Sequence, residues 1–409
     1  MTIHIVGGTY KEYCAWPEHN TLQGSAGRAA LCLSQLDPSL AIKLHSRIAE
    51  ADKVELEEVF VFSKNCELDI TDCPKTTKFD YFHPLSEPKV TPKPPLGVLP
   101  EFDLTKEEID SVVVFGMIEA SPVIKCRVAI YDPQNTYNPV LFSEIGSATE
   151  TLVYVTNSNE LSIFYTRKNS KPASIEVMSE WLSKEEGAEA VVVKCGQRGV
   201  YAYSESEKGW ITPYKTEKVF PIGSGDSFVA AFSFYWLIKG MKIIEATNRS
   251  SIAAAYYVSH KTMNNEQGLE IFSQDLEPLS SKLEKKKIYL AGPFFTLSEL
   301  WMVNEAKQYI ESFGMNVFSP YHELGIGSAE EVVQKDIDAI YDCDVIYALF
   351  DGTDPGTLFE IGFARSASKP VIILAENPKA EELKMYDGSG CKIFSDFSSS
   401  IYHLAWLEK

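Results

Sequence analysis

The sequence predicts an α/β protein with two domains, each built on a mostly parallel sheet. Short apolar runs rich in Val and Ile alternate with helical patterns along the chain, as they do where parallel strands are buried on both faces. A polar, irregular stretch near 274–286 interrupts this alternation, and a new strand and helix series begins after it. The length of 409 residues also exceeds that of most single domains.

The first part of the chain predicts a large sheet. Buried strands are indicated by the runs "IHIVGG", "SVVVFGM", "RVAIYD", "TLVYVT" and "AVVVKCG", which are short, apolar and β-branched. Residues 83–103 contain six prolines, which exclude a regular helix or a central strand and predict a surface loop or lid. We expect one domain over 1–275, a linker over 276–286 and a second domain over 287–409.

The second domain predicts a small doubly wound sheet. Its expected strands are "KIYLAG", "NVFSP", "DVIYALF" and "PVIILAE", and its expected helices are "ELWMVNEAKQYIESFG", "AEEVVQKDIDAIYDC" and "TLFEIGFARSASK". Ligands of such sheets bind beyond the carboxyl ends of the strands. Asp351, Asp354 and Glu360 follow the strand "DVIYALF" and fall at that edge.

Composition excludes some classes of function. Hydrophobic residues make up 45% of the chain and charged residues 23%, and the formal net charge is −19. Phosphate backbones and anionic membranes require a basic surface, so we expect no nucleic-acid partner and no membrane partner. A local basic pocket for one small phosphate ligand is still allowed.

The start "MTIHIVGG" has no basic or long apolar leader, and the longest nearly apolar run, "FVAAFSFYWLI", is shorter than the roughly 20 residues of a membrane span. We therefore expect a cytoplasmic protein. The eight cysteines form no CxxC pair, which indicates reduced, mostly buried thiols and argues against a zinc site.

The stretch "FPIGSGDSFVAAF" at 220–232 predicts a phosphate site. Gly223, Ser224 and Gly225 would let backbone amides approach a ligand, and the amino end of the following helix favours an anion. Asp226 would then accept the proton of an attacking hydroxyl. The alternative is a glycine turn in which Asp226 caps the helix.

This stretch resembles the GAGD signature of the PfkB, or ribokinase-like, family of carbohydrate and nucleoside kinases. Other pieces follow in that family's order over about 1–275, namely "VGG", "QGSAGRAA", "TNSNEL" and "KCGQRG". The resemblance implies ATP and Mg²⁺ as cofactors. It also implies that Asn157 and Glu160 organise Mg²⁺ through water and that Gly196 and Gly199 bind the nucleotide.

The sequence departs from that family at the acceptor side. The family's early sugar-contacting aspartate is at best Glu12, its asparagine is lost in "GRAAL", and Lys194 replaces the usual threonine. The phosphoryl-transfer residues are thus kept while the acceptor pocket is altered. Ribose or fructose phosphate fits poorly, and both a nucleoside acceptor and a degenerate sensor pocket stay open.

Clustered carboxylates near the end of the chain suit cleavage of an N-glycosidic bond. One carboxylate can attack or stabilise C1′ in an oxocarbenium-like state while a second, kept protonated, donates to the leaving base. Asp354 and Glu360 flank a glycine turn into a helix, and Asp336 lies on the preceding helix. The alternatives are helix caps, solvated acids or a Mg²⁺ site.

Residues 287–409 resemble the nucleoside 2-deoxyribosyltransferase family through "IYLAGPFF", "DIDAIYDCD" and "DPGTLFEIGFA". The resemblance implies that Glu360 is the nucleophile, that Tyr289 orients it, and that Asp336 and Asp354 handle the base and its proton. Phe294 or Phe295 could stack on the base, with a core aromatic as the alternative role. The family includes transferases and hydrolases, and it implies no cofactor.

No clear arginine or serine cluster follows "LAGPFF", which favours a free nucleoside over a nucleotide. Together the two resemblances predict a bifunctional enzyme of nucleoside metabolism. Its partners would be nucleosides, nucleobases or sugars, ATP, and further copies of itself in a homo-oligomer. The alternative is a regulatory protein in which a degenerate, nucleotide-sensing domain controls a nucleoside-cleaving domain.

Overall fold

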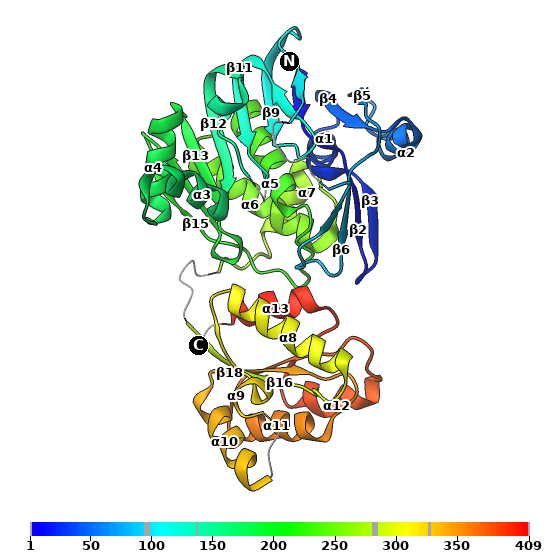
Figure 1. Ribbon diagram of the computed structural model, residues 1–409, viewed down its shortest axis with the longest axis vertical. Coiled ribbons are helices and arrows are strands. Elements are labelled where there is room, and N and C mark those ends of the chain that lie inside the picture. Colours follow the sequence, from blue (N-terminus) through cyan, green and yellow to red (C-terminus); the bar gives the residue numbers. More distant parts are fainter. Residues whose placement is uncertain (1, 94–98, 136–137, 280–284, 326–328, 408–409) are drawn as a thin grey trace. The chain divides into compact units, whose positions relative to one another are not determined.

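The computed structural model of the chain divides into two compact units, Met1–Ser281 and Lys282–Lys409 (Figure 1). It describes residues 2–93, 99–135, 138–279, 285–325 and 329–407. Both units are α/β, as predicted. Part of the expected linker, 280–284, lies outside the described residues, so the proposed domain limits stay a prediction.

The first unit is built on a nine-stranded sheet. In spatial order its strands are β15 (Lys208–Ile211), β14 (Val200–Ser204), β13 (Ala190–Lys194), β12 (Ala148–Asn157), β11 (Lys125–Asp132), β9 (Ile109–Phe115), β1 (Thr2–Val6), β4 (Ala41–Ile48) and β5 (Cys66–Asp72). All neighbours from β13 to β5 pair in parallel, whereas β14 and β15 are antiparallel additions. The five strands predicted from apolar runs all lie in the parallel part.

Helices cover both faces of this sheet, which explains the continuous apolar runs. In β9, Val113 and Phe115 pack in one core while Val112 and Val114 pack in the other, because successive side chains of a strand point to opposite faces. The first core includes residues of α1 (Gly24–Leu36), α5 (Ser224–Phe232) and α6 (Ile243–His260). The second includes residues of α3 (Ser158–Asn169) and α4 (Ile175–Glu186).

Two smaller sheets complete this unit. A four-stranded sheet has the order β3 (His19–Leu22), β2 (Lys11–Cys14), β6 (Lys78–Tyr81) and β7 (Lys89–Thr91), and β8 (Glu101–Asp103) pairs with β10 (Ser121–Val123). The proline-rich segment, 83–103, contributes β7 and β8, each at the edge of its sheet, where the missing N–H of proline is tolerated. The remaining helices of the unit are α2 (Lys53–Val59), α7 (Glu266–Ser273) and the short helical segments η1 (Glu50–Asp52), η2 (Phe142–Ile145), η3 (Gly196–Arg198) and η4 (Ser233–Ile238).

The second unit has a five-stranded parallel sheet with the order β17 (Asn316–Phe318), β16 (Lys287–Ala291), β18 (Val345–Leu349), β19 (Val371–Leu374) and β20 (Lys392–Phe394). In chain order this is 2-1-3-4-5, the flavodoxin-like arrangement. The helices α10 (Ala329–Asp342) and α11 (Pro355–Ser366) share a core with one face. Within this unit, Figure 1 shows α8 (Leu297–Ser312) and α13 (Phe397–Trp406) on the opposite side of the sheet from α10 and α11. The short α9 (Pro320–Glu323) and α12 (Ala380–Gly388) complete it.

Candidate functional sites

A cavity of about 390 Å³ opens at the carboxyl edge of the large sheet in the first unit. The last residues of three neighbouring strands, Asp132, Asn157 and Lys194, meet at this edge because the strands run in parallel. Six of the residues singled out in the sequence line the cavity, together with Glu12, Gln134 and Lys194. These six are Asn157, Glu160, Gly196, Gly223, Gly225 and Asp226.

The amino end of α5 forms one wall of this cavity. Gly223 is the N-cap residue, with φ 82 and ψ 0, a left-handed conformation that glycine adopts without strain. The cap has no side-chain hydrogen bond, and Asp226 lies inside the first helical turn, so Asp226 is not the N-cap that the sequence allowed. A Cβ at Gly225 would lie 3.5 Å from the Lys194 Nζ. The helix amino end and this ammonium together favour a bound anion.

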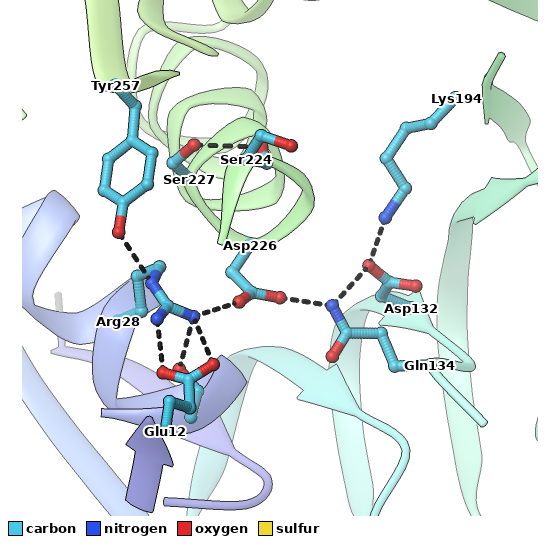
Figure 2. A network of polar contacts seen from close by, with 10 residues as sticks. Glu12, Arg28, Asp132, Gln134, Lys194, Ser224, Asp226, Ser227 and Tyr257 are labelled. Carbon is cyan, nitrogen blue, oxygen red and sulfur yellow. Dashed lines mark hydrogen bonds and ion pairs between the residues drawn. The ribbon is translucent and has the colours of Figure 1, made fainter. Parts of the chain in front are cut away.

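Ser224 and Gly199 lie near the cavity but are not among its lining residues. The Ser224 carbonyl accepts a hydrogen bond from the Ser227 hydroxyl at 2.9 Å, visible in Figure 2. Gly199 has φ 89, and a Cβ there would meet the Ile211 carbonyl oxygen at 2.1 Å. The structure thus gives Gly199 a packing role against β15, whereas Gly196 faces the cavity.

Asn157 and Glu160 form a capping box at the start of α3. The Asn157 Oδ1 accepts hydrogen bonds from the backbone N–H groups of Asn159 and Glu160, both at 3.0 Å. The Glu160 Oε2 accepts from the Asn157 N–H at 3.1 Å and from the Thr156 hydroxyl at 2.8 Å. These bonds use the only side-chain oxygen of Asn157 and one of the two carboxylate oxygens of Glu160. Among the described residues, no group of three or more His, Cys, Asp or Glu is placed to hold a metal ion directly. The other carboxylate oxygen of Glu160 is a donor of the kind that holds Mg²⁺ through its water ligands.

The buried Arg28 side chain forms ion pairs with two carboxylates of the cavity, those of Glu12 and Asp226, as Figure 2 shows. Its side chain is 1% exposed. The Nη1 group donates to the Asp226 Oδ2 at 2.6 Å and to the Glu12 Oε1 at 3.3 Å, Nη2 also pairs with Glu12, and Nε donates to the Tyr257 hydroxyl at 2.8 Å. Burial raises the pKa of the Glu12 carboxyl. The Arg28 cation offsets part of this rise, so that the pKa of Glu12 stays above its ordinary value. No motif in the sequence indicated this role for Arg28.

The second oxygen of Asp226 belongs to a chain of contacts that ends at Lys194 (Figure 2). The Gln134 Nε2 donates to the Asp226 Oδ1 and also to the Asp132 Oδ2, the latter at 3.3 Å. That same Asp132 oxygen accepts from the Lys194 ammonium. Asp132 is fully buried, and its Oδ1 has no hydrogen-bond partner in the described part of the chain. Burial raises the pKa of Asp132, and Lys194 opposes that rise.

The candidate site of the second unit centres on Tyr289 and Glu360. Tyr289 lies in β16, fully buried, and its ring stacks on Phe318 with centroids 5.6 Å apart. Its hydroxyl donates to the Glu360 Oε1 at 2.6 Å. Burial raises the pKa of Glu360 to about 8; Tyr289 opposes the rise, and Asp336 and Asp354 add to it. The structure thus brings the four residues of the predicted glycosyl site close enough to interact.

The other acids at this edge differ in their surroundings. The Asp336 Oδ1 is buried and has no hydrogen-bond partner among the described residues, and burial raises the pKa of Asp336. Asp354 is the N-cap of α11, and its Oδ2 accepts from the Thr357 N–H at 2.8 Å and hydroxyl at 3.0 Å. Asp351 accepts the N–H groups of Glu376 and Asn377 at 2.8 and 2.9 Å, so it braces the loop after β19.

The two candidate stacking residues lie in the loop after β16. Phe295 is 72% exposed, which excludes a core role for it in this unit. Phe294 is half-buried and packs against Phe295 and Tyr321, with ring centroids 4.9 and 5.3 Å apart. The three rings offer an aromatic surface to a flat ligand.

Comparisons with known families match a different family to each of the two units of the chain. A family described as pfkB family carbohydrate kinase matches residues 144–267, and one described as Nucleoside 2-deoxyribosyltransferase matches residues 288–390. The chain carries a domain of each family. The kinase-domain match includes Asn157, Glu160 and Asp226, and the transferase-domain match includes Tyr289 and Glu360.

Individual relatives cover parts of the chain. An uncharacterized protein of Ureaplasma parvum is 30% identical over 153 residues, which is 30% of this chain and 95% of that protein. The 5-dehydro-2-deoxygluconokinase of Bacillus licheniformis is 36% identical over 122 residues, which is 28% of this chain and 37% of that kinase.

Solved structures show the fold of the kinase domain. A ribokinase from Thermotoga maritima matches with a TM-score of 0.52 and 18% identity over 67% of this chain and 100% of its own. A ribokinase II from E. coli, described as putative, matches with a TM-score of 0.50 and 16% identity over 67% of this chain and 99% of its own. At such identities the likeness extends to the fold alone. Within the described residues, no helix is both long and apolar enough to cross a membrane.

Proposed function

We propose that the chain is a bifunctional enzyme of nucleoside metabolism. The transferase domain cleaves or exchanges the N-glycosidic bond of a nucleoside or deoxynucleoside at Glu360, and the kinase domain transfers a phosphoryl group from ATP to a nucleoside or sugar. The observation that carries the proposal is the Tyr289–Glu360 hydrogen bond of 2.6 Å beside the buried Asp336 Oδ1, which has no hydrogen-bond partner in the part of the chain that the structure describes. All eight cysteines are free thiols, which supports the cytoplasm as the location.

Glycosyl transfer would proceed by two displacements at C1′. The ionised Glu360 bonds to C1′ as the bond from C1′ to the base breaks, and Asp336, whose raised pKa suits a proton donor, protonates the leaving base. A second base or water then attacks C1′, gives its proton to the ionised Asp336 and releases the Glu360 carboxylate. Tyr289 holds one Glu360 oxygen and leaves the other for C1′. Phe294 and Phe295 would stack on the base.

Phosphoryl transfer would take place over the amino end of α5. The helix N–H groups, Gly223, Gly225 and Lys194 would hold the ATP phosphates. Asn157 and Glu160 would hold Mg²⁺ through water, and the ion would neutralise phosphate charge. Asp226 accepts the proton of the acceptor hydroxyl while that oxygen bonds to the γ-phosphorus and ADP leaves.

Incubation with a nucleoside mixture and ATP tests both activities, with mass analysis of free base, exchanged nucleoside and phosphorylated product. Glu360→Ala removes the group that bonds to C1′, so base release should fall by several orders of magnitude while phosphorylation survives. Asp351→Asn is the matched control, because it changes an acid at the same edge that only braces a loop. Full base release by Glu360→Ala would reject the double displacement.

A second candidate function is a regulatory protein whose kinase domain binds nucleotide without turnover. The observation that favours it is the engagement of both Asp226 oxygens, one by Arg28 and one by Gln134. ATP consumption measured over a panel of nucleosides and sugars separates the two candidates, since a sensor would bind ATP but form no ADP.

A further inference from the structure

Arg28 leaves Asp226 one oxygen with which to act as a base. The guanidinium lies beneath the cavity, 1% exposed, and contacts Glu12, Tyr257 and the Gly24 carbonyl as well as the Asp226 Oδ2. These partners use nearly all of its five N–H donors, so Arg28 is a fixed anchor. The Asp226 Oδ1 is therefore the oxygen available to an acceptor hydroxyl.

Gln134 covers that oxygen from the cavity side. Its amide Nε2 donates to the Asp226 Oδ1, and Gln134 itself lines the cavity. Its φ of 34 is unusual for a residue other than glycine, and such strained positions cluster at switch regions. While this bond persists, the amide takes one lone pair of the Asp226 Oδ1 and stands between that oxygen and an acceptor hydroxyl in the cavity.

The same amide is poised to change partner. Its two N–H groups are shared, because the Nε2 also donates to the Asp132 Oδ2 at 3.3 Å, an oxygen that accepts from the Lys194 ammonium as well. Asp132 is fully buried and its Oδ1 has no partner among the described residues. A buried carboxylate that loses its cation depends more strongly on its remaining donors, and the Gln134 amide is one of them.

Resting on the proposed kinase activity, we propose that Gln134 is a positioning residue that couples nucleotide binding to exposure of Asp226, the general base of phosphoryl transfer. Lys194 lines the cavity beside Gly225, where a phosphate of the nucleotide attracts its ammonium away from Asp132. The Gln134 amide then shifts toward Asp132, strengthens its bond to that carboxylate and gives up its bond to Asp226, so that the Asp226 Oδ1 can accept the proton of the acceptor.

A pair of variants tests this coupling in the full chain, with ADP formation from ATP measured over the acceptor panel. Asp132→Asn removes the negative charge that draws the Gln134 amide away from Asp226. Because Gln134 then continues to cover Asp226, kcat should fall at least about tenfold. The KM for ATP should stay the same or fall, because Lys194 no longer leaves an ion pair to bind phosphate. Adding Gln134→Leu uncovers Asp226 permanently and should restore kcat to within a few-fold of the parent.

Asp110→Asn is the matched control, since it breaks an exposed ion pair with Arg127 in the same unit and should change neither constant. Thermal unfolding confirms that each variant folds. If the parent forms ADP but the double variant stays as slow as Asp132→Asn, or if Asp132→Asn keeps its kcat, the coupling is wrong. If the parent and every variant form no ADP, the kinase proposal and the coupling both fail.

Discussion

Glu360 is the residue whose protonation should govern glycosyl transfer. Its pKa is about 8, above neutrality, and a nucleophilic carboxyl must be ionised to attack C1′. We therefore expect kcat/KM for base cleavage to rise with pH as Glu360 ionises, and to fall again at the pH where Asp336, the proposed proton donor, loses its proton. Tyr289→Phe removes the hydrogen bond that lowers this pKa, so it should move the rising limb to higher pH. A pH profile that is flat through neutrality would contradict the assignment.

Asp226 should be needed for phosphoryl transfer alone. Asp226→Asn keeps the shape of the first turn of α5 but removes the proton acceptor, so ADP formation should fall at least about a hundredfold, the usual scale for losing a general base. Base cleavage by the transferase domain should be unchanged and serves as the internal control. Equal loss of both activities would indicate general misfolding instead.

At the scale of the element, the start of α5 depends on a glycine for two reasons. Gly223 has φ 82, and a Cβ there would lie 2.2 Å from the Arg28 Nε, an atom held in place by Tyr257. Gly240 has φ 66 and no atom within 4 Å of a built Cβ, so Gly240→Ala isolates the conformational cost. We expect about 1 kcal/mol for Gly240→Ala and clearly more for Gly223→Ala. Chemical denaturation measures both, and equal costs would mean that Arg28 moves aside freely.

The elements that the sequence predicted well are those buried on both faces. The runs in β9, β12, β13, β16, β18 and β19 are continuous and apolar because both sides of each strand meet helices. The strands β2, β3 and β6 were not predicted. Each has only four residues, of which at least two are half-buried, and such a strand is too short for alternation to stand out from a loop.

Some residues of the candidate sites could be predicted from the sequence and others could not. Asp226, Asn157, Glu160 and Glu360 belong to contiguous motifs, so their positions could be read from a few adjacent residues. Arg28 could not, because its partners Asp226 and Tyr257 lie 198 and 229 positions away in sequence. An arginine in "GSAGRAAL" is typical of a solvated helix face, and only the packing of α1 against α5 and α6 buries it.

At the scale of the whole molecule, we expect a homo-oligomer. Tyr341 and Phe359, each 57% exposed, flank Phe363 with ring centroids 5.3 and 5.9 Å away. This apolar patch lies on α10 and α11, the helices that carry Asp336 and Glu360, and suits burial against another copy. Light scattering should give a mass above that of the 45.7 kDa chain, and Phe359→Ser should lower it. Phe62→Ser, at a residue 93% exposed in the kinase domain, is the control and should not. A fully active monomer would reject the prediction.

The net charge of −19 gives a further expectation for the whole chain. Duplex DNA binding requires a basic surface that neutralises phosphates, so no complex should form at physiological salt. A gel shift with a random duplex checks this, and a salt-sensitive complex at micromolar protein would contradict it.

The packing of Arg28 against Gly223 has a consequence for how this pocket can evolve. A side chain at position 223 would displace Arg28, and loss of Arg28 alone would leave Glu12 and Asp226 as buried carboxylates without a cation, which is strongly destabilising. Loss of Glu12 alone would remove the residue that pairs with both terminal nitrogens of Arg28. A descendant with a different acceptor pocket must therefore change Glu12 and Arg28 nearly together, because each single change is destabilising. We expect Glu12, Arg28 and Gly223 to be kept or replaced as a set.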